Sequence, residues 1–251
     1  MNEQAIKDLL YKLADDLLIL GHRNSEWTGF GPILEEDIAF SSMAQDKIGH
    51  SLAFYTLLHE LGEADPDTVA FTRNANQFHN SQLVELPNGE YDFSLIRHFL
   101  YDNAEIIRFE MLSQSSYEPI AKVATKLKGE VKYHVLHANT WIRNLGSSTE
   151  EAIARLQTSL NEALPYALGM FEPSAYEQDL IDASIYRGEE AVKAAWQQRI
   201  RAVLEKTELQ LPDLESITPI TGGRTGSHTH HLQPLLDEMA EVFKIDPAAE
   251  W

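Results

Sequence analysis

The sequence predicts an all-α protein built on a four-helix core. Apolar residues recur at spacings of three and four through most of the 251 residues, and convincing alternating strand patterns are absent. Three of the first four expected helices are long. The connection between the second and third expected helices is too long for a simple hairpin. A four-helix core with one long crossover is the topology of ferritin-like bundles, which we therefore expect here.

The first four helices form the predicted core, about residues 2–146. Their expected ranges are about Asn2–His22, Ile33–Leu61, Asp92–Ser116 and Glu118–Leu145. The second helix follows a turn rich in Gly and Thr, and Asp92 is a suitable N-cap for the third. The fourth stops at Gly146, a residue type favoured just beyond a helix C-terminus.

Three more helices are expected outside that core, within about residues 149–251. Ser147–Glu151 contains an N-cap signal for a helix that reaches about Met170. The last two are expected over about Glu189–Lys206 and His231–Phe243. The segments 62–91 and 209–227 are punctuated by Pro and Gly, so we expect them to be irregular. The whole chain, 1–251, is predicted to form one ferritin-like domain.

Composition excludes several classes of function. The net charge is −19, with 39 acidic and 20 basic residues, which argues against nucleic-acid binding because phosphates need clustered cations. The absence of cysteine excludes disulfides, thiolate metal sites and cysteine nucleophiles. No signal peptide and no stretch of about 18 apolar residues is present, so we expect a cytoplasmic protein that does not span a membrane.

Each helix of the predicted core carries an acid within an apolar row. These acids are Asp46 in the second helix, Asp102 in the third and Glu130 in the fourth, with Asp15 as a weaker member in the first. In two helices a histidine follows four residues after the acid, His50 after Asp46 and His134 after Glu130. One inward carboxylate per helix, with two histidines, is the composition of a carboxylate-bridged di-iron site.

The spacing differs from that of working di-iron sites, in which the histidine follows its glutamate by three residues. One extra residue turns the side chain about 100° further round the helix. Three of the four acids are also aspartates, which are shorter by one methylene. We therefore expect no metal and a vestigial site at Asp15, Asp46, His50, Asp102, Glu130 and His134. The alternatives are a buried polar network, a bound metal, or simple solvent exposure of these side chains.

Several stretches, in chain order, resemble the family of C subunits of phenylacetyl-CoA epoxidase. They are Glu26–Ala39, Phe71–Arg73 with Gln77–Asn80, Leu83–Gly89, Glu130–His134 and Thr221–Leu232. The resemblance implies a ferritin-like fold and a structural, non-catalytic role in aerobic phenylacetate degradation. The implied partner is a homologous A subunit, which carries the two irons and epoxidises phenylacetyl-CoA. The implied complex also contains a small subunit, together with a flavin and iron–sulfur reductase.

The same resemblance implies that the crossover loop contacts the coenzyme A part of the substrate. The corresponding residues are Arg73, Asn74, Asn76 and Gln77, which offer one positive charge and several hydrogen-bonding groups. Tyr176 and Glu177 are further candidates for such contact. The alternative is a folded surface connection packed by Phe71 and Phe78.

Three other possibilities remain from the sequence. His228, His230 and His231 suggest a metal site, but standard ligand spacing is absent, so a helix-start or interface role is expected. A stand-alone ferritin-like metal-dependent oxidase would use the six residues of the predicted vestigial site. A free-standing acyl-CoA binding protein is the third possibility.

Overall fold

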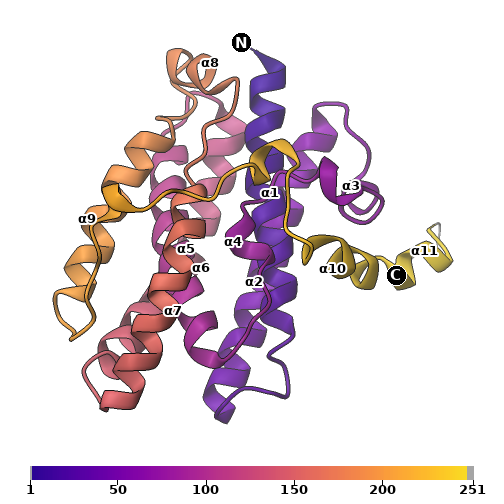
Figure 1. Cartoon of the computed structure of the whole chain (residues 1–251). Helices are drawn as coiled ribbons and strands as arrows, with labels where there is room; N and C mark the ends of the chain where they lie inside the picture. The colour runs from indigo at the N-terminus through magenta and orange to yellow at the C-terminus, as the bar shows by residue number, and fades with distance from the viewer. Residues whose placement is uncertain (1, 248–251) are drawn as a thin grey trace. The chain divides into compact units, whose positions relative to one another are not determined.

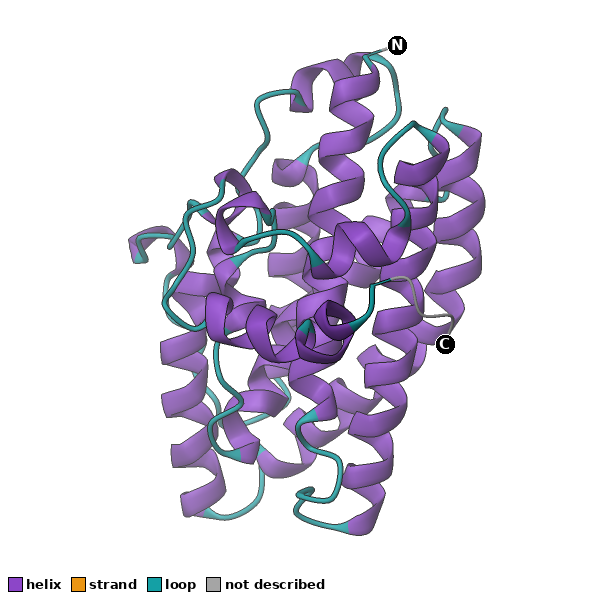
Figure 2. Cartoon of the chain, turned by 90° about the vertical axis from the view of Figure 1, so that its right-hand side faces the viewer, coloured by secondary structure: helices purple, strands orange, loops and turns teal. Residues whose placement is uncertain are grey.

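The computed structural model describes residues 2–247, and in this part of the chain every regular element is a helix (Figure 2). The all-α prediction is therefore confirmed. None of the helices described is long and apolar enough to cross a membrane. The chain divides into two compact units, which are described separately: Asn88–Thr221 with the first few residues, and Ile6–Pro87 with the chain from Gly222 onward.

The long helices lie where the sequence predicted them, with ends shifted by a few residues (Figure 1). They are α1 (Glu3–Ser25), α2 (Leu34–Glu60), α5 (Tyr91–Leu112), α6 (Glu118–Leu145), α7 (Glu150–Gly169) and α9 (Glu189–Leu204). The last predicted helix is divided at Ala240 into α10 (Leu232–Met239) and α11 (Glu241–Ile245).

Several short helices were missed because they contain too few residues to show a helical period. They are α3 (Pro66–Phe71), η1 (Ala75–Gln77), α4 (Gln82–Glu85), α8 (Glu177–Asp182), η2 (Leu214–Ser216) and η3 (Gly223–Thr225). Local capping shapes at least one of them. The Asp65 carboxylate accepts the Thr68 backbone N–H at 3.0 Å, and Pro66 occupies the first turn of α3, where its missing N–H does no harm.

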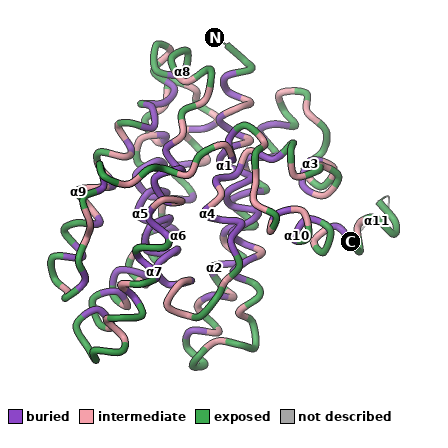
Figure 3. Tube along the Cα trace, in the orientation of Figure 1, coloured by how far each residue is buried: buried purple, intermediate pink, exposed green. Residues whose placement is uncertain are grey.

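Helix α5 is the centre of the first unit. It packs against α6, α7 and α9, and Figure 3 shows it buried along most of its length. The predicted inward row from Leu95 through Asp102 to Phe109 is buried, but so are most residues on its other faces. The indole N–H of Trp196 in α9 donates to the Leu100 carbonyl at 2.9 Å, which fixes α9 against α5.

The capping predictions were partly right. Thr149 caps α7, because its hydroxyl oxygen accepts the Ala152 N–H at 3.2 Å. Asp92 is not an N-cap: Glu90 holds that position, and the Asp92 carboxylate instead accepts the Ser159 hydroxyl at 2.7 Å. Gly146 ends α6 as its C-cap residue, in a right-handed conformation.

A buried ion pair anchors α9 to α5. The Arg108 guanidinium donates to the Glu189 carboxylate at 2.8 Å and to the Met170 carbonyl at 2.9 Å. The Tyr186 hydroxyl donates to the other Glu189 oxygen at 2.9 Å. Burial, and secondarily the Glu189 charge, raise the pKa of the Tyr186 phenol well above its ordinary value.

In the second unit the C-terminal segment is tied to the helices and loop that precede it. Arg224 makes a two-pronged pair with Asp16 of α1, with both N–O distances at 2.8 Å, and it also donates to the His79 carbonyl at 2.9 Å. A Cβ on Gly223 would lie 2.4 Å from the Asn80 carbonyl oxygen. Glycine is therefore required at position 223 by this close approach.

The histidine that follows is part of the same attachment. His228 uses both ring nitrogens, Nδ1 with the Glu85 carboxylate at 2.8 Å and Nε2 with the Phe78 carbonyl at 3.0 Å. The Thr229 hydroxyl oxygen accepts the His231 N–H at 3.2 Å, at the start of α10. These bonds leave no ring nitrogen of His228 for a metal, and they agree with the expected helix-start role.

Replacing Tyr186 by Phe will make the free energy of unfolding depend less steeply on pH in the alkaline range. The unfolded phenol titrates near pH 10 and the folded one higher, so above about pH 10 the unfolded state binds fewer protons and stability falls. Without this group, the free energy of unfolding should fall less steeply, by up to about 1.4 kcal/mol per pH unit. Urea unfolding between about pH 9 and 11 measures the slope. Identical slopes in both proteins would contradict the assignment.

Candidate metal centre

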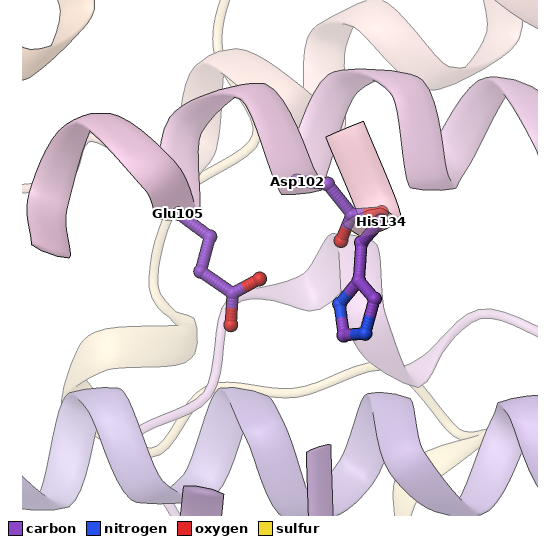
Figure 4. A group of neighbouring side chains, drawn as sticks. All are labelled: Asp102, Glu105 and His134. Atoms are coloured by element: carbon purple, nitrogen blue, oxygen red, sulfur yellow. The ribbon is translucent and has the colours of Figure 1, made fainter. Parts of the chain in front are cut away.

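Three side chains of metal-ligating type meet in the first unit. Asp102 and Glu105 come from α5 and His134 comes from α6, and all three are buried (Figure 4). Each offers one ligand atom, and these atoms lie within 4.8 Å of one another. Asp102 and Glu105 share a helix face because they are three residues apart. The cluster provides two carboxylates and one imidazole.

Two further contacts hold this cluster in place. His98, one turn before Asp102 on α5, lies with its Nδ1 3.0 Å from an Asp102 oxygen. The Asn103 amide donates to the Asn139 side-chain oxygen at 2.9 Å and so joins α5 to α6 next to the cluster. His98 therefore gives the buried Asp102 carboxylate a hydrogen-bonding partner.

The prediction that Glu130 points inward is wrong. Glu130 is exposed, whereas Val131 and His134 are buried on the face of α6 that faces the core. The buried face of α6 is therefore rotated from the predicted face, so that Val131 is buried where Glu130 was expected. It consists of Ile120, Ala124, Leu127, Val131, His134, Ala138 and Ile142.

The same shift occurs on α2. Asp46 is only half-buried, and the middle of the buried face carries Lys47, which is fully enclosed, followed by His50. The residue three positions before each buried histidine is therefore Lys47 on α2 and Val131 on α6. Working di-iron sites carry glutamate at this spacing. Valine has no donor atom, and a protonated lysine has no lone pair to offer a metal.

Asp15 is buried, as the sequence predicted, but its carboxylate is already saturated. One oxygen accepts the Tyr55 hydroxyl at 2.5 Å and an Arg73 N–H at 2.6 Å. The other accepts a second Arg73 N–H at 3.0 Å and the His79 backbone N–H at 2.7 Å. Four donors occupy the four lone-pair directions of a carboxylate, so Asp15 has no direction left for a metal.

These residues do not fit a pair of irons, because both Glu-x-x-His glutamates are replaced and the acid of α1 is fully hydrogen-bonded. Sequence reasoning missed Lys47, Glu105 and Val131. The signal was present: counting three residues back from each buried histidine, instead of forward from each acid, points to Lys47 and Val131. Glu105 was recognisable as the second acid three residues after Asp102.

The predicted coenzyme A loop lies in the second unit, and its charged residue is engaged. Besides its pair with Asp15, the Arg73 guanidinium donates to the carbonyls of Val69 at 2.6 Å and Gln77 at 3.0 Å. Burial by itself lowers the pKa of Arg73, but the Asp15 carboxylate outweighs it and holds the pKa above its ordinary value. The positive charge of Arg73 is thus matched within the protein.

The other candidates for coenzyme A contact occupy separate places. Asn74, Asn76 and Gln77 are exposed around η1, and the Gln77 side chain accepts the Asn74 N–H at 2.9 Å. Tyr176 precedes α8 in the first unit and is 38% exposed. Glu177 accepts the Glu189 N–H at 3.0 Å at the start of α9. Contact of any of these residues with coenzyme A stays a prediction.

The helical architecture, with buried acids and histidines on the long helices, defines a ferritin-like class of protein. The model of the phenylacetic acid catabolic protein family matches residues 1–251. The chain therefore belongs to this family, and the resemblance found in its motifs is confirmed.

Two curated relatives extend this result. The chain is 31% identical over 241 residues to the C subunit of 1,2-phenylacetyl-CoA epoxidase from Escherichia coli strain K12, covering 96% of each chain. It is also 25% identical over 148 residues to the A subunit of 1,2-phenylacetyl-CoA epoxidase from that organism, covering 59% of this chain and 48% of the relative. The chain is thus similar to two different subunits named for one epoxidase.

Replacing Arg73 by Met will destabilise the protein by about 3 kcal/mol or more, because the buried Asp15 carboxylate loses its cation. Arg155→Met is the matched control, since Arg155 pairs with Glu151 on the exposed surface of α7 and its loss should cost about 0–1 kcal/mol. Chemical unfolding of both variants gives the comparison. Equal stability of the two variants would mean that Arg73 is not needed for folding and is available for a ligand.

Proposed function

We propose that this chain is a non-catalytic structural subunit of a phenylacetyl-CoA epoxidase complex. The observation that carries the proposal is the replacement of both metal-binding glutamates by Lys47 and Val131. Similarity to the C subunit of the Escherichia coli epoxidase over 96% of the chain supports the same role. A bundle with this fold but without a complete ligand set retains its helix-packing surfaces and cannot by itself perform di-iron chemistry.

In this proposal the chemistry takes place in a homologous A subunit, which holds the di-iron cofactor, while this chain holds none. The weaker similarity to the A subunit of the Escherichia coli epoxidase supports a common origin of the two chains. The complex also includes a small subunit, together with a flavin and iron–sulfur reductase, and all of them act in the cytoplasm. In this arrangement the complex epoxidises phenylacetyl-CoA, and this chain serves as a structural support for the complex.

Helix α2 offers a surface for the A subunit. Large apolar side chains are exposed at Leu34, Ile38, Ile48 and Leu52, at fractions between 37% and 72%. Their spacing places them on one face of the helix, and Phe30 and Ile33 extend the same apolar character just before it. We call these six residues the α2 apolar face. An exposed apolar stripe of this length is typical of a surface that a partner protein covers.

Purified protein expressed with added iron should contain far fewer than two irons per chain, because the ligand set for two irons is incomplete. The A subunit prepared in the same way is the positive control. Elemental analysis and single-turnover assays measure the two outcomes. Stoichiometric iron together with epoxidation by this chain without the A subunit would end the proposal.

The double variant Leu34→Asp, Ile38→Asp should bind the A subunit more weakly, by at least about thirtyfold, as expected when central apolar contacts of an interface are lost. Val242→Asp, Ile245→Asp changes two exposed apolar residues of α11 and serves as the matched control. Co-purification and a titration of the two chains measure the effect. If the control variant loses the partner and the α2 variant keeps it, the docking surface is wrongly assigned.

The cluster of Asp102, Glu105 and His134 supports one alternative, a stand-alone oxidase with a mononuclear metal. Three protein ligands with open positions are found in catalytic metal sites. Under this alternative Glu105→Gln and His134→Gln abolish metal uptake and activity together. Under the structural proposal both variants leave the activity of the assembled complex largely intact.

A further inference from the structure

We propose that a groove between α5 and α9, in the first unit, binds a multiply phosphorylated nucleotide. The groove has a volume of about 620 Å³, within the size range of pockets for small ligands. Its charged lining consists of four cations, Arg143, Arg187, Arg199 and Lys206, and one acid, Glu110. This set is called the basic groove below.

The charge of the basic groove is opposite to that of the protein. Acidic residues outnumber Lys and Arg by 39 to 20 in the whole chain, whereas in the groove cations outnumber acids by four to one. Gathering four like charges around one hollow is unfavourable unless an anion neutralises them. Three elements supply the cations: Arg143 comes from α6, Arg187 from the loop before α9, and Arg199 and Lys206 from α9 and its end.

The side-chain N–H groups of these four cations are available to an anionic ligand. Arg187 and Lys206 are exposed, and within the part of the chain that the structure describes their side chains make no hydrogen bond or ion pair. Among the residues described, Arg143 donates only its Nε, to the Asn139 carbonyl at 3.0 Å. Arg199 lies 3.9 Å from the Glu110 carboxylate, beyond hydrogen-bonding distance. Planar guanidinium groups with free terminal N–H pairs are suited to phosphate oxygens.

The remainder of the groove suits the uncharged parts of a nucleotide. Its apolar lining includes Ile107 and Met111 from α5 and Val203 from α9, against which a base can pack. A second hollow of about 400 Å³ shares Met111 and Arg187 with the first. Ile181, Ile185 and Tyr186 line it together with the polar residues Gln114 and Ser184, so an uncharged arm attached to the phosphates finds both apolar surface and hydrogen-bonding groups there.

A nucleotide that carries a long uncharged arm is the chemistry of a coenzyme A thioester. The choice of coenzyme A as the main probe rests on the proposed function, whereas the preference for phosphates rests on the lining alone. The cations surround a hollow of about 620 Å³, a size that suits a small molecule.

The test is calorimetric titration of the whole purified chain, without the A subunit, with coenzyme A, ADP and pyrophosphate. Arg143→Gln, Arg187→Gln and Lys206→Gln should each weaken the binding of coenzyme A by about tenfold, the effect of losing one charge-assisted contact. Lys122→Gln and Arg155→Gln remove the same charge from exposed pairs on α6 and α7 and should change binding little. Added salt should weaken the binding of every probe.

Tighter binding of coenzyme A than of ADP supports use of both hollows, and equal binding of all three probes supports recognition of the phosphates alone. No binding of any probe at millimolar concentration overturns the proposal. Equal effects of the groove and control variants also overturn it, since the attraction would then be diffuse. If the unmodified chain binds none of the probes and the groove variants no longer bind the A subunit, the groove would be assigned to a protein partner instead. Thermal unfolding verifies that each variant is folded, and failure of the α2 docking test leaves this result unaffected.

Discussion

The structure depends on the pairing of buried carboxylates with basic side chains of the chain itself. An isolated buried carboxylate is too unfavourable to persist without a partner. In a metal-holding bundle the inward acids are compensated by the ions they bind. Here buried acids pair with basic side chains of the protein: Asp15 with Arg73, Asp16 with Arg224, Glu85 with His228, Asp102 with His98 and Glu189 with Arg108.

These pairs satisfy the buried carboxylates with groups of the chain itself. Arg73 saturates Asp15 with hydrogen bonds, and Lys47 and Val131 stand three residues before the buried histidines, where neither offers a metal ligand. The pairs Asp16–Arg224 and Glu85–His228 also attach the C-terminal segment to the helices and loop before it. These two pairs therefore help to hold the C-terminal segment in place.

The two proposed binding surfaces consist of other residues than the cluster of Asp102, Glu105 and His134. The α2 apolar face offers a partner protein an uncharged contact, while the basic groove gathers positive charge on a chain that is otherwise strongly acidic. In the proposed role, the first feature docks the catalytic chain and the second retains a phosphorylated ligand. The two roles use different units and can be separated by mutation.

The sequence by itself determined the all-helical class, the long helices and the burial of Asp15, Asp102, His50 and His134, because these follow from the helical period and local capping. It failed for Asp46 and Glu130, since a polar residue at the edge of an apolar row fits two neighbouring helix faces equally well. Only the tertiary structure decided which face is buried and which cation meets which acid. Arg73 and Asp15 are 58 residues apart, and no local pattern encodes a contact made by folding.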